Sequence, residues 1–167
     1  MDVFAASAAP SIPPLQTVTR LQSALSEAGI ESVVGGSWLL ASLGLIQTVQ
    51  DWDLVIDSEA GVQGGRWVDP VPAVEQVLAA MGLRHLRRER SGIFRTSAAL
   101  QVDAGDHSID VLVGFALESQ GRVVSIPARP GHMWQGLRMA RPEEWLAAYR
   151  LMGRAERAEA LQRHLGR

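Results

Sequence analysis

The stretch that decides the fold is VVGGSWLLASLGL, residues 33–45, together with QDWDLVID, residues 50–57. The β-branched residues before the glycine pair predict a short strand over 30–34, and the apolar spacing after it predicts a helix over 38–45. The second segment alternates and then becomes apolar, which is typical of a buried central strand. A strand, a glycine turn, a helix and a central strand therefore follow one another directly.

The rest of the chain fits around this unit as one domain. Further helices are expected over 15–28, 73–81, 142–152 and 154–165, and further strands over 84–103, 107–113 and 121–126. We expect a long loop over 58–72, a turn over 127–131, and a hairpin formed by the strands that end at 103 and 113. This order predicts a single mixed-sheet α/β or α+β domain over residues 15–167, after a flexible leader over residues 1–14 that is rich in Ala, Ser and Pro.

Composition excludes several classes of protein. The 167 residues are 47% hydrophobic and 20% charged, a balance typical of a globular core rather than of disorder or fibrous repeats. There is no cysteine, which excludes disulfides, thiol catalysis and cysteine-type metal sites, and all 16 basic residues are arginine, which excludes lysine chemistry. The net charge of −2 gives no overall attraction to nucleic acid or to an anionic membrane. With neither a signal peptide nor a long apolar run, we expect a cytoplasmic protein without membrane contact.

The turn Gly35-Gly36-Ser37 is the first candidate site. Glycines between a strand and a helix let the backbone approach a ligand closely, and the exposed N–H groups there attract phosphate. The alternative is a tight turn in which Ser37 caps the following helix.

Asp51 and Asp53 are the second candidate, at the beginning of the apolar strand. Side chains two apart on a strand share a face, so both carboxylates are expected to project together. Carboxylates that close repel each other unless a cation lies between them, and oxygen ligands suit Mg²⁺. The alternative is the start of a strand with two solvated acids.

Asp110 is the third candidate, within the apolar run HSIDVLV, residues 107–113. Burying an unpaired acid in such a strand is costly. One explanation is a salt bridge, with Arg95 as the partner. The other is that Asp110 joins Asp51 and Asp53 as a third carboxylate facing a metal ion.

Other residues favour structural roles. Trp38, Trp52 and Trp145 are expected in the core, whereas Trp67 and Trp134 lie in loops and either line a ligand pocket or close the edge of the core. A run of arginines favours a solvated face over a binding patch; it comprises Arg84, Arg87, Arg88, Arg90 and Arg95.

In this order and spacing, the glycine turn, QDWDLVID and IDVLV resemble the nucleotidyltransferase superfamily, which has the polymerase-β-like fold. The resemblance covers about residues 30–115 and is to small bacterial members, such as aminoglycoside and lincosamide nucleotidyltransferases and nucleotidyltransferase-like toxins. It implies an α+β domain with a mixed β-sheet flanked by helices. The tail also resembles the late helices of small members, with Arg150 or Arg154 where a lysine often stands.

The resemblance also implies roles for the candidate residues. Asp51 and Asp53 would hold Mg²⁺ or Mn²⁺ against the triphosphate of an NTP, and Asp110 would ligate a second metal ion and help to deprotonate an acceptor hydroxyl. The turn Gly35-Gly36-Ser37 would bind the nucleotide phosphates.

Two functions follow from the resemblance. The first is transfer of a nucleoside monophosphate from an NTP to a hydroxyl of a small molecule, a protein or an RNA such as a tRNA end. The second is a catalytically degenerate binding or regulatory module, with a cognate partner protein in a toxin–antitoxin pair.

Overall fold

The computed structural model describes residues 14–166. The expected leader over residues 1–14 lies outside the described residues apart from Pro14. The helices are α1 (Leu15–Glu27), α2 (Gly36–Ser42), the short 3-10 helix η1 (Ser58–Gly61), α3 (Val71–Ala80), α4 (Pro142–Leu151) and α5 (Ala155–His164). The strands are β2 (Val33–Gly35), β3 (Trp52–Ile56), β4 (Val62–Gln63), β5 (Arg66–Trp67), β6 (His85–Arg88), β7 (Ala98–Asp103), β8 (Ser108–Val113), β9 (Ala116–Ser119), β10 (Arg122–Ser125), β11 (Pro130–Trp134) and β12 (Leu137–Ala140).

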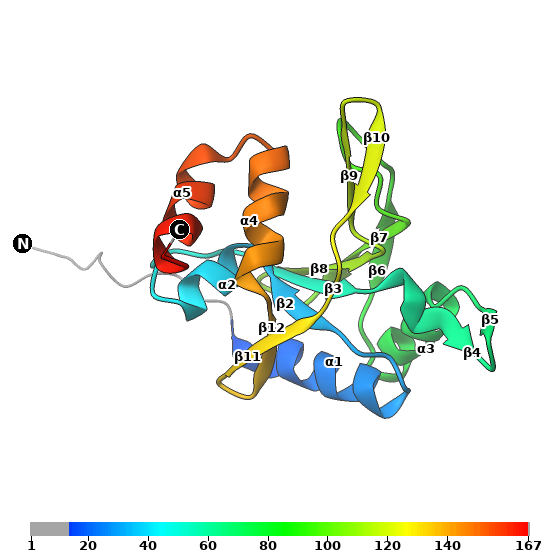
Figure 1. Cartoon of the computed structure of the whole chain (residues 1–167). Coiled ribbons are helices and arrows are strands. Elements are labelled where there is room, and N and C mark those ends of the chain that lie inside the picture. The colour runs from blue at the N-terminus through cyan, green and yellow to red at the C-terminus, as the bar shows by residue number, and fades with distance from the viewer. Residues whose placement is uncertain (1–13, 167) are drawn as a thin grey trace, which may run out of the picture.

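A seven-stranded mixed sheet in the order β11-β12-β2-β3-β8-β7-β6 forms the centre of the molecule (Figure 1). Its middle strand β3 pairs antiparallel with β2 and parallel with β8, as expected for the segment that the sequence marked as central. β7 and β8 form the expected antiparallel hairpin. The fold is therefore α+β, a mixed sheet flanked by helices, as the sequence predicted.

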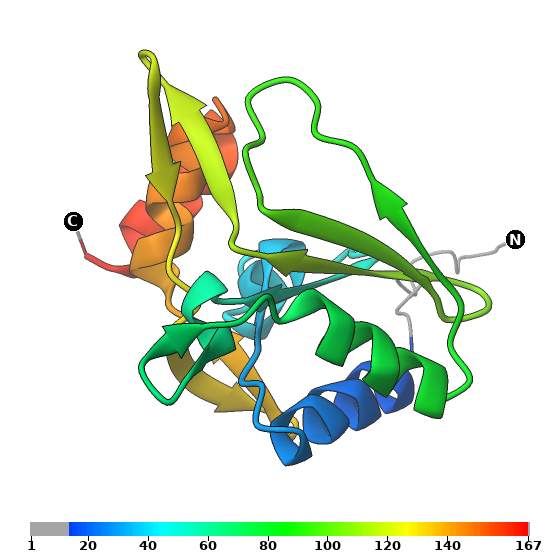
Figure 2. The ribbon, with the colours of Figure 1, turned by 90° about the vertical axis from the view of Figure 1, so that its right-hand side faces the viewer.

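Helices cover the two faces of this sheet differently. α1 and α3 lie side by side against one face, whereas α4, α5 and the β9–β10 hairpin lie on the other side (Figures 1 and 2). Strand β8 shows why: Ile109, Val111 and Val113 are buried, and Asp110 and Leu112 between them are only partly buried. The apolar positions therefore face the α1–α3 layer, and the acid faces the other side.

The single strand expected over residues 84–103 is two strands in the structure. Residues 84–103 form β6 and β7, which pair antiparallel, and the segment 89–97 between them leaves the sheet. That segment bonds to β9 instead, through Arg95 N–H to Ala116 O at 2.8 Å and Glu118 N–H to Ile93 O at 2.7 Å. Residues 89–97, β9 and β10 together form a projection from the sheet, called the arm below (Figure 2). The strand pattern of the sequence is real, but the chain reverses within it.

The sequence missed the short strands at the sheet edge. β11 and β12 occupy residues expected to be a turn or unassigned, and β12 joins the sheet through parallel pairing with β2, a contact between distant parts of the chain. The expected loop over 58–72 contains η1 and the small β4–β5 hairpin. Helix boundaries agree to within two or three residues, and α2 shows the largest difference, since it begins at Gly36 and ends at Ser42. No helix in the described range 14–166 is long and apolar enough to cross a membrane.

Candidate active site

Strand register brings two of the three predicted acids together. Asp53 on β3 lies directly opposite Asp110 on β8, and Gly35 on β2 lies opposite Asp53 on its other side. Residues paired in register point to the same face of a sheet. Both carboxylates therefore face the side of the sheet that α4, α5 and the arm surround.

The glycine turn is built against Asp53. Gly36 has φ +63°, and a Cβ atom at this position would overlap the Oδ2 atom of Asp53. A Cβ at Gly35 would overlap the indole of Trp145. Both glycines are required by close contacts, and Gly36 is also required by its backbone conformation. Helix α2 begins at Gly36 with Gly35 as its N-cap, so the alternative in which Ser37 caps the helix is wrong.

The two acids repel each other in a partly buried position. Burial first, and then the negative charges of Asp110 and Asp51, raise the pKa of Asp53 from 3.8 to about 7, against the opposing charge of Arg157. Burial likewise raises the pKa of Asp110, and nearby Arg88 opposes this, with its Nη1 4.0 Å from Oδ1. Asp110 Oδ1 is buried without a hydrogen-bond partner. This arrangement favours a cation between the two carboxylates.

Asp51 does not share their orientation. It lies in a bend before β3 begins, is exposed, and its Oδ1 accepts a hydrogen bond from the N–H of Ser108 at 3.0 Å. It lines a neighbouring cavity together with His107 and Ser108. The expectation that Asp51 and Asp53 share a face assumed a strand that already included Asp51. Among residues 14–166, no group of three or more His, Asp or Glu side chains is arranged to hold a metal ion.

A cavity of about 350 Å³ opens over Asp53 and Asp110. Gly36 and Ser37 contribute to its wall beside Asp53. Four arginines also line it: Arg88, Arg90, Arg154 and Arg157. Acids on the floor and guanidinium groups on the walls form a site suited to an anionic ligand that is bound together with a cation.

The late helices supply the part of the site that sequence reasoning missed. Arg157 Nη1 donates to the hydroxyl of Tyr149 at 3.4 Å, and its guanidinium lies 5.7 Å from the centre of that ring. Arg154 lines the cavity, whereas Arg150 is exposed and does not. In the sequence, Arg157 could have been linked to the site only through its spacing: it lies three residues after Arg154 at the start of a helix, so both side chains lie on the same face of that helix.

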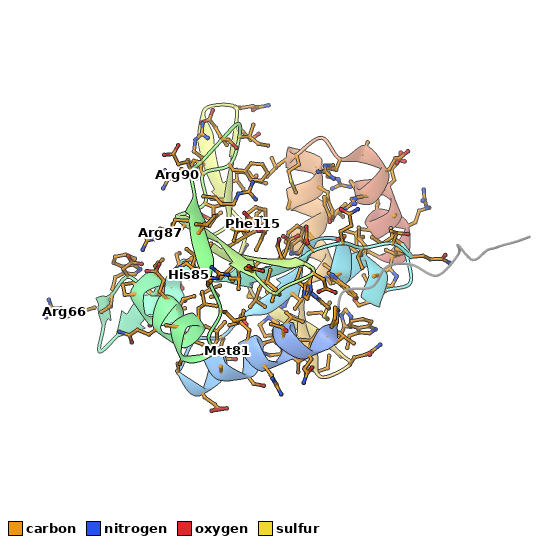
Figure 3. The ribbon with its side chains drawn as sticks, turned by 180° about the vertical axis from the view of Figure 1, so that it is seen from behind. Arg66, Met81, His85, Arg87, Arg90 and Phe115 are labelled. Carbon is orange, nitrogen blue, oxygen red and sulfur yellow. The ribbon has the colours of Figure 1, made fainter. Side chains whose placement is uncertain are left out.

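Two expectations about the arginine run need correction. Arg95 pairs with Glu118 at 2.7 Å and is not the partner of Asp110, whose arginine neighbour is Arg88. Arg88 and Arg90 line the cavity, whereas Arg87 pairs with Glu75 at 3.2 Å outside it. Figure 3 shows Arg87 and Arg90 along β6 and the segment after it, with Phe115 between the arm and α4. The run is therefore partly a solvated face and partly a cavity wall.

The tryptophans divide much as expected. Trp38 and Trp52 are buried and stack with their ring centres 3.7 Å apart. Trp145 is also buried, but its ring contributes to the cavity. Neither Trp67, which is 62% exposed, nor Trp134 lines this cavity, so the idea that they form a pocket there is wrong.

The residues present fit a magnesium ion. Asp53 and Asp110 offer carboxylate oxygens on one face, and Asp110 Oδ1 is buried without a hydrogen-bond partner, so the pair suits a divalent cation with oxygen ligands. The glycine at position 36 leaves room directly beside Asp53 Oδ2.

Comparison with known proteins identifies the fold. No protein-family model matches the chain. No curated protein matches its sequence either. Among solved structures, it is similar to TM1012 from Thermotoga maritima, a proposed nucleotidyltransferase, with a TM-score of 0.62 and 18% identity over 91% of this chain and 92% of that one.

The antibiotic-resistance factor ANT(2'')-Ia is a second structural neighbour. Its solution structure gives a TM-score of 0.58 and 16% identity over 90% of this chain and 85% of that one. Its crystal structure in complex with adenylyl-2''-tobramycin gives a TM-score of 0.55 and 14% identity, over 90% and 88%. At these identities the likeness shows the fold alone. The chain has the fold of the nucleotidyltransferase superfamily, as the sequence motifs predicted.

Proposed function

We propose that this protein transfers a nucleoside monophosphate from an NTP to an acceptor hydroxyl. The hydroxyl oxygen forms a bond to the α-phosphorus, the bond from that phosphorus to the β-phosphate oxygen breaks, and pyrophosphate leaves with the electron pair. The observation that carries this proposal is the register of Asp53 and Asp110 beside Gly36, on the floor of an arginine-lined cavity.

Asp53 and Asp110 would hold Mg²⁺ or Mn²⁺, with Asp51 as a third ligand after its carboxylate leaves the Ser108 N–H. Bound there, the metal would offset the charge of the triphosphate and of the reacting oxygens. Without it, Asp53 and Asp110 present two like charges to an anionic nucleotide, which opposes binding. Nucleotide binding is therefore expected to require the cation.

The phosphates would lie between the glycine turn and the late helices. Gly36 and Ser37 line the cavity on one side of Asp53, and Arg154 and Arg157 line it from α5 and its N-cap. Arg157 is close enough to Asp53 to oppose the rise in its pKa. A guanidinium is a bidentate donor that matches phosphate oxygens, so both arginines suit the β- and γ-phosphates.

Asp110 would take the proton from the acceptor hydroxyl. Its pKa is raised by burial, which makes it a better base than an exposed carboxylate, and its Oδ1 has no hydrogen-bond partner. It also lies on the side of Asp53 away from the glycine turn, because β8 and β2 flank β3 on opposite sides. Nucleotide and acceptor would thus approach from opposite sides.

Thermal unfolding with ATP, GTP, CTP or UTP tests the binding step. An NTP should raise the unfolding temperature only when Mg²⁺ or Mn²⁺ is present, because bound ligand stabilises the folded state. Asp110→Asn should abolish this shift and keep the far-UV circular dichroism spectrum. Asp103→Asn, a change on β7 outside the cavity, is the matched control. A wild-type protein with no metal-dependent response to any NTP would contradict the proposal.

Transfer itself is tested with α-³²P-labelled NTPs incubated with a lysate. Label that becomes fixed to protein, RNA or a small molecule, and is absent with Asp110→Asn, identifies the acceptor class. Release of labelled nucleoside monophosphate to water alone would contradict a specific acceptor.

A second candidate rests on the position of Asp51. Because its carboxylate is held by Ser108 N–H rather than facing Asp53, the site can also serve a module that binds nucleotide without transferring it. Such a module would suit a regulatory role beside a cognate protein in a toxin–antitoxin pair. Metal-dependent NTP binding with no transfer to any fraction of the lysate would favour it.

A further inference from the structure

The cavity has two sides, and only one is used by the nucleotide in the proposed function. Across the sheet the strands run β2, β3, β8, β7 and β6. Gly36 and Ser37 lie at the β2 end with the α5 arginines, and the two acids lie in the middle. The β6 end and the arm remain for the acceptor, which must reach Asp110 from there.

The acceptor side carries positive charge. Arg88 ends β6, and Arg90 follows it in the arm, and both line the cavity. The Nε of Arg90 donates to the carbonyl oxygen of Thr96 at 3.1 Å, which holds the guanidinium of this exposed residue in place. Arg88 Nη1 lies 4.0 Å from Asp110 Oδ1, so a ligand held by Arg88 lies close to the base. Glu89 between them is the one acid on this side of the cavity.

The same side offers an apolar surface. Phe94, in the arm, is 40% exposed and lines the cavity, and Leu112 lines it from β8. The backbone of the arm around Phe94 is tied to β9 by a bridge to Leu117 and by Arg95 N–H to Ala116 O at 2.8 Å. The backbone that carries Phe94 is therefore fixed against β9, and its ring presents an aromatic surface to the cavity.

These groups do not suit a polycation. The structural neighbour ANT(2'')-Ia binds adenylyl-2''-tobramycin, a product built on an aminoglycoside that carries several ammonium groups. Recognition of such a molecule needs several free carboxylates. Here Asp53 and Asp110 are committed to the cation, Glu89 is left alone, and Arg88 and Arg90 repel ammonium groups.

We propose that the acceptor is an anionic hydroxyl compound, with a phosphate or carboxylate held by Arg88 and Arg90 and an apolar part against Phe94, and that aminoglycosides are not acceptors. This inference rests on the proposed function. The transfer is that described above: the acceptor oxygen replaces pyrophosphate on the α-phosphorus and gives its proton to Asp110. Both a phosphorylated small molecule and an RNA end carry this chemistry.

The test begins with nucleotide binding, which separates the two proposals. If the wild-type protein does not bind Mg²⁺ with α,β-methylene-ATP, the proposed function fails before the acceptor is considered. With that nucleotide saturating, three probes are titrated by isothermal calorimetry: phenyl phosphate, phenol and tobramycin. We expect phenyl phosphate to bind at least tenfold more tightly than phenol, and tobramycin not to bind. Tobramycin binding as tightly as phenyl phosphate, or no binding of phenyl phosphate, overturns the inference.

Variants assign the binding to this side of the cavity. Arg90→Gln should weaken phenyl phosphate at least tenfold, since it removes a charge-assisted pair. Phe94→Ala should weaken both aromatic probes and leaves the arginines in place, which keeps the test valid if Arg90→Gln does not fold. Arg87→Gln, on the same strand but paired with Glu75 outside the cavity, is the control and should bind like the wild type. Equal losses in Arg87→Gln and Arg90→Gln overturn the inference.

Labelled NTP then distinguishes the two sources of the anion. Incubation with the small-molecule fraction and the RNA fraction of a lysate should label one of them, and either result supports the inference when the labelled acceptor itself carries a phosphate or carboxylate; a labelled neutral acceptor overturns it. Labelling of added tobramycin overturns it.

Discussion

Asp53→Asn should stabilise the metal-free protein at neutral and higher pH while destroying its ability to bind metal and nucleotide. Asp53 has its pKa raised from 3.8 to about 7, chiefly by burial and then by the charges of Asp110 and Asp51. A carboxyl whose pKa is raised on folding holds its proton more tightly in the folded state. The free energy of unfolding therefore falls as pH rises from about 4 to about 7.

The size of the effect follows from the shift. About three pKa units correspond to about 4 kcal/mol at full burial, and partial solvent access reduces this to about 2 kcal/mol. Asparagine has the same shape without the charge, so above pH 7 Asp53→Asn should unfold at a temperature about 4–8 °C higher than the wild type. At pH 4, where Asp53 is protonated in the wild type, the difference should nearly vanish.

The assay is thermal unfolding by circular dichroism from pH 4 to pH 8, with and without Mg²⁺ and ATP. Magnesium with ATP should stabilise the wild type and not the variant. Asp57→Asn is the control, directly after the same strand: Asp57 accepts hydrogen bonds from the N–H groups of Glu59 and Ala128 and lies outside the cavity, so its change should give no stabilisation. An Asp53→Asn protein less stable than the wild type at pH 8, or an advantage that does not shrink toward pH 4, would refute the reasoning.

Three further predictions concern the surroundings of Asp53. Gly36→Ala should lower the free energy of unfolding by about 2 kcal/mol or more, because the alanine Cβ would overlap Asp53 and residue 36 has φ +63°. The same overlap should abolish nucleotide binding. Denaturant unfolding measures the stability and calorimetry the binding. Arg157→Gln should raise the pKa of Asp53 further and weaken Mg-ATP about tenfold, whereas the exposed Arg150→Gln should change neither; equal effects would reject the assignment to Arg157. Trp52→Ala should cost about 3–5 kcal/mol in denaturant unfolding, since the ring is fully buried and stacked on Trp38, and a loss below 1 kcal/mol would contradict that packing.

The sequence predicted the parts of the fold that depend on local pattern. β3 and β8 are apolar runs with single acids inside them, and an acid in such a strand stands out because burying it is costly. The glycine turn was equally visible, because Gly36 needs both a positive φ and the absence of a side chain. The pairing of Asp53 with Asp110 followed from these patterns and the resemblance together.

What the sequence could not predict depends on contacts between distant residues. β12 is four residues long, and its place beside β2 is set by one parallel pairing. The chain reverses at residues 89–97 because this segment forms backbone hydrogen bonds with β9. No sequence pattern within the segment predicts that pairing. Arg157 enters the site because α5 folds back on α4, and Asp51 turns away because β3 begins one residue after it.

The most direct test is a crystal structure grown with Mn²⁺ and α,β-methylene-ATP, with the anomalous signal used to locate the metal. We expect Mn²⁺ within coordination distance of oxygens of Asp53 and Asp110, with Asp51 released from Ser108 and the triphosphate against Arg154 and Arg157. A metal bound elsewhere, or a nucleotide bound in the cavity with no metal at the two carboxylates, would contradict this expectation.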